Sequence, residues 1–207
     1  MKNFFGEDGL LYRGVNKFVD LVILNVMYML SCIPIFTIGA ANTSLYTLTL
    51  KMCKNEEGHI AKQYWKTFRS NLKKSTIIWC LFLVLFLMLG IDFWIFEHYD
   101  LQMKKLFQII ICAIFLITMM VYSYVFPLIA VFENTIKHYL KNAVIISMTR
   151  IGYTIFIVLM NLIPILLFAV GGKWLVTGMR IFILIGWALI AYINSFLLNK
   201  VLERYKK

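Results

Sequence analysis

Three ionisable side chains lie within or beside long apolar stretches of this sequence, and they are the first candidates for chemistry. Asp92 and Arg180 interrupt such stretches, and Asp20 stands just before another. A charge inside a membrane is costly, so it is usually paired or functional. Asp92 and Arg180 would lie at similar depth near the same membrane surface. We therefore predict an intramembrane ion pair between them, with a structural role favoured over transport chemistry. Asp20 falls within a turn of the opposite surface, where water can reach it.

Sequence signatures of enzymes are absent. The histidines His59, His98 and His138 stand near predicted loops and have no companions at metal-ligand spacing. The chain has neither a phosphate-binding G-x-x-x-x-G-K-[ST] loop nor a G-x-S-x-G nucleophile motif. The four cysteines show no paired spacing and are interpreted as small packing residues: Cys32, Cys53, Cys80 and Cys112. We therefore expect no catalytic site, no metal site, no cofactor and no enzymatic activity.

The composition places these residues in a membrane. Of the 207 residues, 61% are hydrophobic and 15% are charged, whereas globular chains average about 45–50% and about 25%. Runs without any Asp, Glu, Lys or Arg cover 21–50, 75–91, 106–132, 151–172 and 181–199, and a run of about 18 such residues can cross a bilayer. We predict an all-α, polytopic transmembrane helical bundle with five to six membrane segments and a short amphipathic interfacial helix.

The distribution of Lys and Arg predicts the topology of this single membrane domain, residues 1–207. The basic regions 51–74 and 133–150 and the C-terminal tail are expected in the cytoplasm under the positive-inside rule. The same rule explains the net charge of +11 without nucleic acid. The predicted segments are spans at 14–33, 75–97, 106–132, 151–170 and 174–198, and a short return span or re-entrant helix at 36–50. We expect a multi-pass cell-membrane protein whose C-terminus faces the cytoplasm. The N-terminus also faces the cytoplasm if residues 14–50 form a helical hairpin.

Residues 21–50 are too long for one straight span, because about 45 Å of helix would have to fit a hydrocarbon core of about 30 Å. Two alternatives follow: a helical hairpin, which the N-terminal basic residues favour, or one tilted helix followed by an interfacial segment. In the hairpin the bend lies at Pro34 to Gly39, since proline lacks a backbone donor and glycine permits tight turns. The segment 34–46 is then either a buried bend or the edge of a polar cavity, and we favour the bend.

Polar side chains inside the predicted spans have a simpler interpretation. Asn25, Asn161 and Asn194 are expected to form hydrogen bonds between helices rather than to bind ligands. Pro127 and Pro164 are expected to mark kinks.

The basic segment 59–73 has helical periodicity. Ile60, Tyr64, Phe68 and Leu72 recur every four residues, and the cations fall on another face: Lys62, Lys66, Arg69 and Lys73. This pattern is typical of an amphipathic helix that lies in a layer of anionic lipid headgroups. The alternatives are a solvated connector helix and a helix that docks on a partner protein.

The string PIFTIGAANTSLYTL at 34–48, followed by FRSNLKK at 68–74, resembles the YesL-like family of small bacterial membrane proteins that carry a domain of unknown function. The matching positions are Pro34, Thr37, Ile38, Gly39, Ala41, Leu45, Tyr46, Phe68, Asn71 and Lys73, and the length and helix layout also fit. One departure is Ala40, where the family usually has proline. Among these residues Pro34, Thr37, Gly39 and Tyr46 define the helix break and the family motif.

The resemblance implies a function only by association. Members are commonly found with carbohydrate ABC-importer and glycan-degradation gene groups in Gram-positive bacteria, and no activity is established for them. It therefore implies a non-enzymatic accessory to a carbohydrate uptake system, with ABC-transporter permease subunits as the implied partners. The alternative is a small transporter or channel for a small solute, in which Asp92, Arg180 and the break at 34–46 would be the polar elements.

Overall fold

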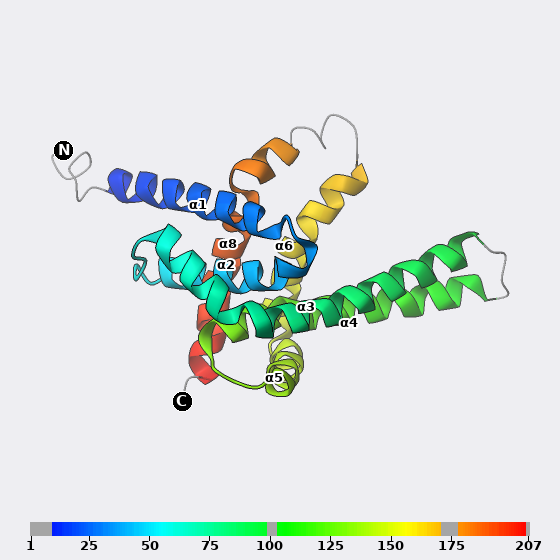
Figure 1. Cartoon of the computed structure of the whole chain (residues 1–207). Helices are drawn as coiled ribbons and strands as arrows, with labels where there is room; N and C mark the ends of the chain where they lie inside the picture. Colours follow the sequence, from blue (N-terminus) through cyan, green and yellow to red (C-terminus); the bar gives the residue numbers. More distant parts are fainter. Residues whose placement is uncertain (1–9, 99–102, 171–177, 206–207) are drawn as a thin grey trace.

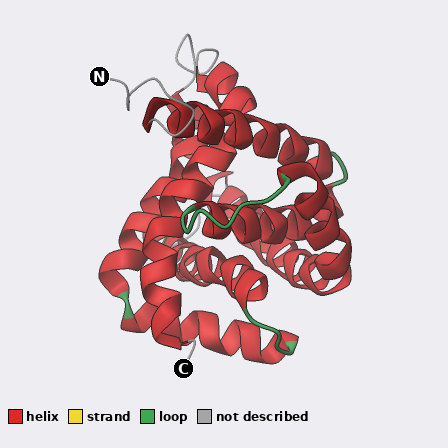
Figure 2. Cartoon of the chain, turned by 90° about the vertical axis from the view of Figure 1, so that its left-hand side faces the viewer, coloured by secondary structure: helices red, strands yellow, loops and turns green. Residues whose placement is uncertain are grey.

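A computed structural model of the chain describes residues 10–98, 103–170 and 178–205, and this part contains helices and no strand (Figures 1 and 2). The elements are α1 (Leu10–Cys32), η1 (Ile35–Thr37), α2 (Ile38–Met52), α3 (Ile60–His98), α4 (Lys104–Val131), α5 (Ile136–Thr149), α6 (Ile151–Val170), the π-helical η2 (Phe182–Gly186), α8 (Trp187–Leu202) and η3 (Glu203–Tyr205). The predicted all-α helical bundle is confirmed. The predicted loop at 171–173 and residues 174–177 of the last predicted span lie outside the described residues.

Within the described residues, four helical stretches are long and apolar enough to cross a membrane: Gly14–Cys32, Ile60–His98, Lys104–Val131 and Gly178–Tyr205. A fifth arises if Ile136–Thr149 and Ile151–Leu166, which meet at a bend of 107°, form one broken span. The count of four to five overlaps the predicted five to six membrane segments at five. Helix α2 is not among these stretches, because it has 15 residues and measures only about 22 Å. These helices indicate a multi-pass integral membrane protein.

Helices α1 and α2 form a hairpin, as the first of the two alternatives predicted (Figure 1). The chain leaves α1 after Cys32, turns through η1 and returns as α2. Thr37 closes the turn, because its hydroxyl donates to the carbonyls of Ser31 and Pro34, each at 2.6 Å. The indole of Trp79 on α3 also donates to the Ile35 carbonyl at 2.7 Å.

Gly39 has a different role from the one predicted. It lies inside α2, and a Cβ built there would meet Ser75 O and would lie 2.6 Å from Trp79 Cβ. The glycine is therefore required by the close approach of α2 to α3 and not by the turn, which ends at Thr37.

Helix α2 lies at the centre of the molecule. Twelve of its 15 residues are buried, and it packs against α1, α3, α4 and α8. Small residues such as Ala40, Ala41 and Ser44 allow neighbouring backbones to approach closely. The most polar of the apolar segments is thus the most enclosed one.

Helix α3 replaces two predicted elements, the interfacial helix at 59–73 and the span at 75–97. It is continuous over 39 residues, or about 58 Å, because no glycine or proline interrupts the sequence between them. Ile60, Tyr64 and Phe68 of the predicted apolar stripe are buried against the protein, so they do not insert into lipid. Leu72, the fourth, is exposed. The basic face is exposed, as predicted: Lys62, Lys66, Arg69 and Lys73.

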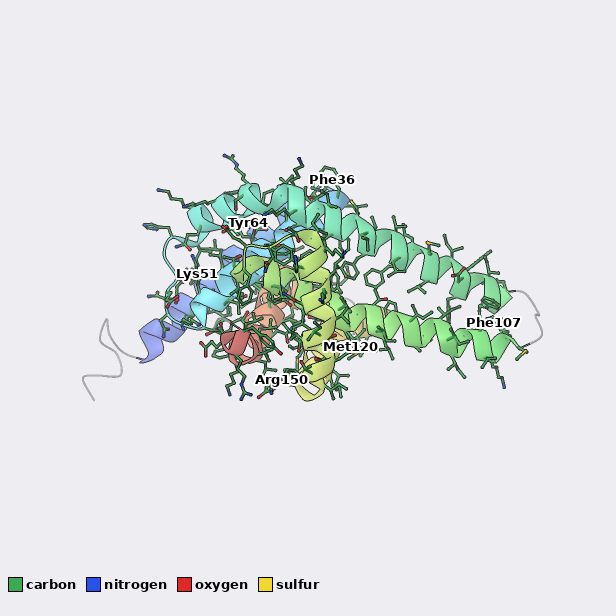
Figure 3. All side chains as sticks on the ribbon, turned by 90° about the horizontal axis from the view of Figure 1, so that it is seen from below. Phe36, Lys51, Tyr64, Phe107, Met120 and Arg150 are labelled. Carbon is green, nitrogen blue, oxygen red and sulfur yellow. The ribbon has the colours of Figure 1, made fainter. Side chains whose placement is uncertain are left out.

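The far ends of α3 and α4 project beyond the rest of the molecule as a two-helix arm, which we define as Leu89–His98 and Lys104–Ile111 (Figures 1 and 3). Phe107, labelled in Figure 3, lies near its tip and stacks on Phe96 with ring centroids 4.9 Å apart. Leu89 and Ile111, the limits of the arm nearest the bundle, are its only buried residues among those the structure describes.

Residues 133–150, predicted as a basic loop, contain the helix α5. The pattern that escaped prediction is Tyr139, Ala143 and Ile146, which are spaced four and three residues apart and are all buried. The Tyr139 hydroxyl donates to Phe132 O at 2.7 Å and accepts from the Asn134 amide at 2.8 Å, which fixes the turn between α4 and α5. By contrast, the predicted spans 106–132 and 151–170 correspond closely to α4 and α6.

Hydrogen bonds draw the basic regions together at one side of the molecule. Lys17 Nζ donates to Met52 O at 3.1 Å and to Asn55 Oδ1 at 2.7 Å. Lys54 pairs with Glu203 at 2.8 Å, and the Thr149 and Tyr205 hydroxyls lie 3.4 Å apart. This grouping agrees with the prediction that these regions share one side of the membrane. Their cytoplasmic location stays a prediction.

Candidate functional site

A small polar cavity lies between five helices at the centre of the bundle. Its volume is about 80 Å³. The polar side chains that line it come from α1, α2, α4 and α6: Tyr28, Asn42, Tyr46, Tyr122, Ser123 and Asn161. Trp187 and Ala191 of α8 complete the wall.

One chain of hydrogen bonds crosses the cavity wall from α1 to α4. The Tyr28 hydroxyl donates to Asn42 Oδ1 at 3.0 Å, and Asn42 Nδ2 donates to the Tyr122 hydroxyl at 2.9 Å. Tyr28 and Asn42 are buried, so these bonds stay out of contact with lipid. Asn42 joins three helices through one amide.

A second chain runs from α4 through α6 to α8. Asn161 Nδ2 donates to Ser123 Oγ at 3.0 Å, and Asn194 Nδ2 donates to Asn161 Oδ1 at 3.1 Å. The Tyr46 side chain also approaches Asn194 and Asn161. Asn194 is fully buried, and its Oδ1 accepts no hydrogen bond from the residues that the structure describes. An unpaired acceptor of this kind can bind one further donor.

Asn25 of α1 holds the π-helical segment η2 in place. Its Nδ2 donates to Phe182 O at 3.1 Å and to Ile183 O at 2.8 Å, and its Oδ1 accepts from the Ala188 amide at 3.0 Å. A π-helical turn leaves backbone groups without their usual partners, and in a membrane these must be satisfied by neighbouring groups. The predicted role of Asn25, Asn161 and Asn194 in hydrogen bonding between helices is confirmed.

The chemistry of the cavity is neutral. None of the described residues that line it is an Asp, Glu, Lys, Arg, His or Cys, so they offer hydrogen bonds and aromatic faces but no group that exchanges protons near neutral pH. The space is large enough for a few water molecules or a very small uncharged solute. It lies well below the roughly 300–1,000 Å³ of ordinary ligand pockets, so a sugar does not fit.

The predicted pair of Asp92 and Arg180 is wrong. Both side chains are exposed, and no ion pair joins them among the described residues. Asp92 lies on the arm, whereas Arg180 lies in the helical stretch that begins at residue 178, and Figure 1 shows these two regions apart. Similar depth along two spans does not make them neighbours, because α3 pairs with α4 instead. Among the described residues, no three His, Cys, Asp or Glu side chains are grouped so that they could hold a metal ion.

The family-motif residues divide between the turn and the cavity. Pro34 is exposed in the turn, Thr37 closes the turn, Gly39 contacts α3 and Tyr46 lines the cavity. The segment is therefore both a bend, at 33–37, and the edge of a polar cavity, at 42–46. Sequence reasoning missed Tyr28 and Tyr122 at this site. The available signal was a tyrosine within an apolar run, whose hydroxyl needs a partner when buried.

The helices and the enclosed polar network define the class of the molecule as a helical integral membrane protein. Residues 21–93 of the chain match the model of an uncharacterised family described as "Protein of unknown function, DUF624". The match covers the C-terminal half of α1, all of α2 and most of α3, and it includes the segment 34–46. No curated protein and no solved structure matches the chain.

Proposed function

We propose that the protein is a non-enzymatic accessory subunit of a membrane transport system, and that it docks beside a permease through the arm. The observation that carries this proposal is Asp92. It is exposed, it is the single charged residue of α3 between residues 75 and 96, and it forms neither an ion pair nor a hydrogen bond with the residues the structure describes. Lipid tails cannot satisfy a carboxylate, whereas a donor on a partner helix can.

The surroundings of Asp92 support helix docking. Gly90 lies about one helical turn before Phe93 and Trp94, next to the face that carries Asp92, and a Cβ built there would have no atom within 4 Å. A small residue on an open helix face allows a second helix to approach closely. Phe93 and Trp94 beside it are also exposed. The arm thus offers an exposed carboxylate at Asp92, a gap between side chains at Gly90 that we call the notch, and exposed aromatic rings at Phe93 and Trp94.

The carbohydrate part of the proposal rests on the resemblance of the 34–74 segment to the YesL-like family. It points to ABC-importer permease subunits as partners in a cell membrane. The exposed cations Lys62, Lys66, Arg69 and Lys73 would contact anionic headgroups on the cytoplasmic side. The chain would need no cofactor and catalyse no reaction.

Photo-crosslinking in native membranes tests the docking. A photoreactive amino acid at Phe93 should join the chain to a single permease subunit, which mass spectrometry identifies. Gly90→Leu, which fills the notch, should abolish the adduct, and Gly14→Leu, a substitution at another open glycine, should retain it. Crosslinks to lipid alone, together with purification of the protein without a permease, would overturn the proposal.

The cavity favours a second candidate, a small channel or transporter for an uncharged solute. Its neutral lining, which includes the side chains of Asn42 and Asn161, suits glycerol better than an ion, although the cavity is small at about 80 Å³. Glycerol flux into proteoliposomes, blocked by Asn161→Leu and absent for glycerate, would favour this candidate. Flux no faster than in empty liposomes would exclude it.

A further inference from the structure

An open groove runs along the elbow between α5 and α6 and is closed on its other side by α8. Its volume is about 660 Å³. Thr149, Arg150 and Gly152 lie at the elbow, where the two helices meet at 107°. Tyr153 and Phe156 of α6 and Phe196 of α8 are among the residues that form its apolar wall. Figure 3 labels Arg150 on the body of the molecule, away from the arm.

Arg150 is a half-buried cation that has no acidic partner in the described part of the chain. Its backbone carbonyl accepts from the amide and the hydroxyl of Thr154, each at 3.0 Å. Its guanidinium forms no ion pair and no hydrogen bond with the residues that the structure describes. Arginine remains charged at any physiological pH, and its planar fork matches a phosphate. A bound anion would therefore stabilise this half-buried guanidinium beside apolar side chains.

The rest of the groove is apolar and open to the outside. Tyr153 is 37% exposed, Phe156 38% and Phe196 47%. Among the residues that line the groove, Arg150 carries the charge, and we call its side of the groove the cationic end. The Thr149 hydroxyl lies 3.4 Å from that of Tyr205, which places the cationic end beside the C-terminal tail.

We propose that this groove binds one anionic phospholipid, with its phosphate on Arg150 and an acyl chain along Tyr153, Phe156 and Phe196. A free phosphate would use the cation but not the wall. Since lipid tails are as apolar as the wall itself, the wall positions a chain without selecting it. The preference for an anionic over a neutral phospholipid comes from the contact of the headgroup with Arg150. The site is independent of the arm and of the docking proposed for it.

Native mass spectrometry of the purified full chain tests the site with phosphatidylglycerol, phosphatidylcholine and inorganic phosphate as probes. We expect one phosphatidylglycerol to be retained at least ten-fold more than phosphatidylcholine. Arg150→Gln should abolish this preference, and Arg150→Lys should retain part of it. Gly152→Leu fills the groove without a clash, because a Cβ there has no atom within 4 Å, and it should lower retention of both lipids. Gly14→Leu serves as its matched control.

Three results would overturn the proposal. One is an Arg150→Gln variant that keeps the preference for phosphatidylglycerol. Another is inorganic phosphate that displaces the lipid while Gly152→Leu has no effect, which would indicate a simple anion site. The third is a photoreactive phosphatidylglycerol that crosslinks the wild-type chain outside residues 149–156 and 193–197. This mapping needs no variant, so the proposal stays testable even if a substitution prevents folding.

Discussion

Helix α2 and the arm distribute the same kinds of residue in opposite ways. In α2 the polar side chains face inward, and Asn42, Thr43, Ser44 and Thr49 are all buried. In the arm the large apolar side chains face outward, among them Ile91, Phe93, Trp94, Ile109 and Ile110. This inversion suits a bilayer, because lipid covers apolar side chains and the protein interior must satisfy the polar ones.

The two regions therefore depend on different forces. Around α2, close backbone approach and directional bonds hold the helices together, such as the 2.8 Å contacts between the hydroxyls of Thr43 and Ser75 and of Thr49 and Ser195. The arm depends on stacked rings, such as Phe96 with Phe107. Packing errors and lost hydrogen bonds should thus cost more at the centre than in the arm, and matched substitutions can measure the difference.

The largest difference is expected between two glycines. Gly39→Ala would drive a methyl group into Ser75 O and Trp79 Cβ, and overpacking of this kind lowers the free energy of unfolding by about 3 kcal/mol. Gly90→Ala in the arm meets no atom within 4 Å and should change it by less than about 1 kcal/mol. Unfolding by SDS in mixed micelles, followed by circular dichroism, compares them. Equal losses would contradict the close packing of α2 on α3.

The next difference is expected between two amides. Asn25→Leu leaves Phe182 O, Ile183 O and the Ala188 amide without their partner, which should cost about 2 kcal/mol. Gln108→Leu in the arm removes one bond, 2.7 Å long, to the exposed Glu97, and should cost about 0.5 kcal/mol. The same titration measures both. If Asn25→Leu proves neutral, η2 is not stabilised by this side chain.

The smallest effects are expected at the two ion pairs. Lys54→Met breaks the 2.8 Å pair with Glu203. Lys104→Met breaks the 3.9 Å pair with the Glu97 carboxylate at the arm tip and the exposed 2.8 Å hydrogen bond to the Glu97 carbonyl. Each should cost about 0.5 kcal/mol, since exposed pairs are largely screened. The decrease in the free energy of unfolding should be smaller still for both variants when the unfolding titration is repeated in 0.5 M salt. A loss from Lys104→Met several times larger would show that the arm is held at its tip.

Local signals in the sequence predicted the helices well. Charge-free runs gave spans close to α4 and α6, and the proline at 34 marked the bend of the α1–α2 hairpin. The predicted bonding role of Asn25, Asn161 and Asn194 held because a buried amide in a membrane helix has few other options. The sequence also showed the exposed basic face of α3, although its apolar face proved to pack on the protein.

Two of the errors share one cause. The pairing of Asp92 with Arg180 and the turn role of Gly39 both required knowledge of which helices are neighbours, and periodicity along one helix does not contain it. The helix α5 was missed because the basic residues of 133–150 outweighed the weaker apolar pattern of Tyr139, Ala143 and Ile146.

The sequence by itself determined that this chain forms apolar helices and where α1 ends, because helix length, charge-free runs and proline act locally. Only the tertiary structure decided that α2 occupies the centre, that Asn42 and Tyr46 line a cavity, and that Arg150 lies in an apolar groove. These features depend on contacts between segments far apart in the chain. Burial, and with it the need of each polar group for a partner, is set by those contacts.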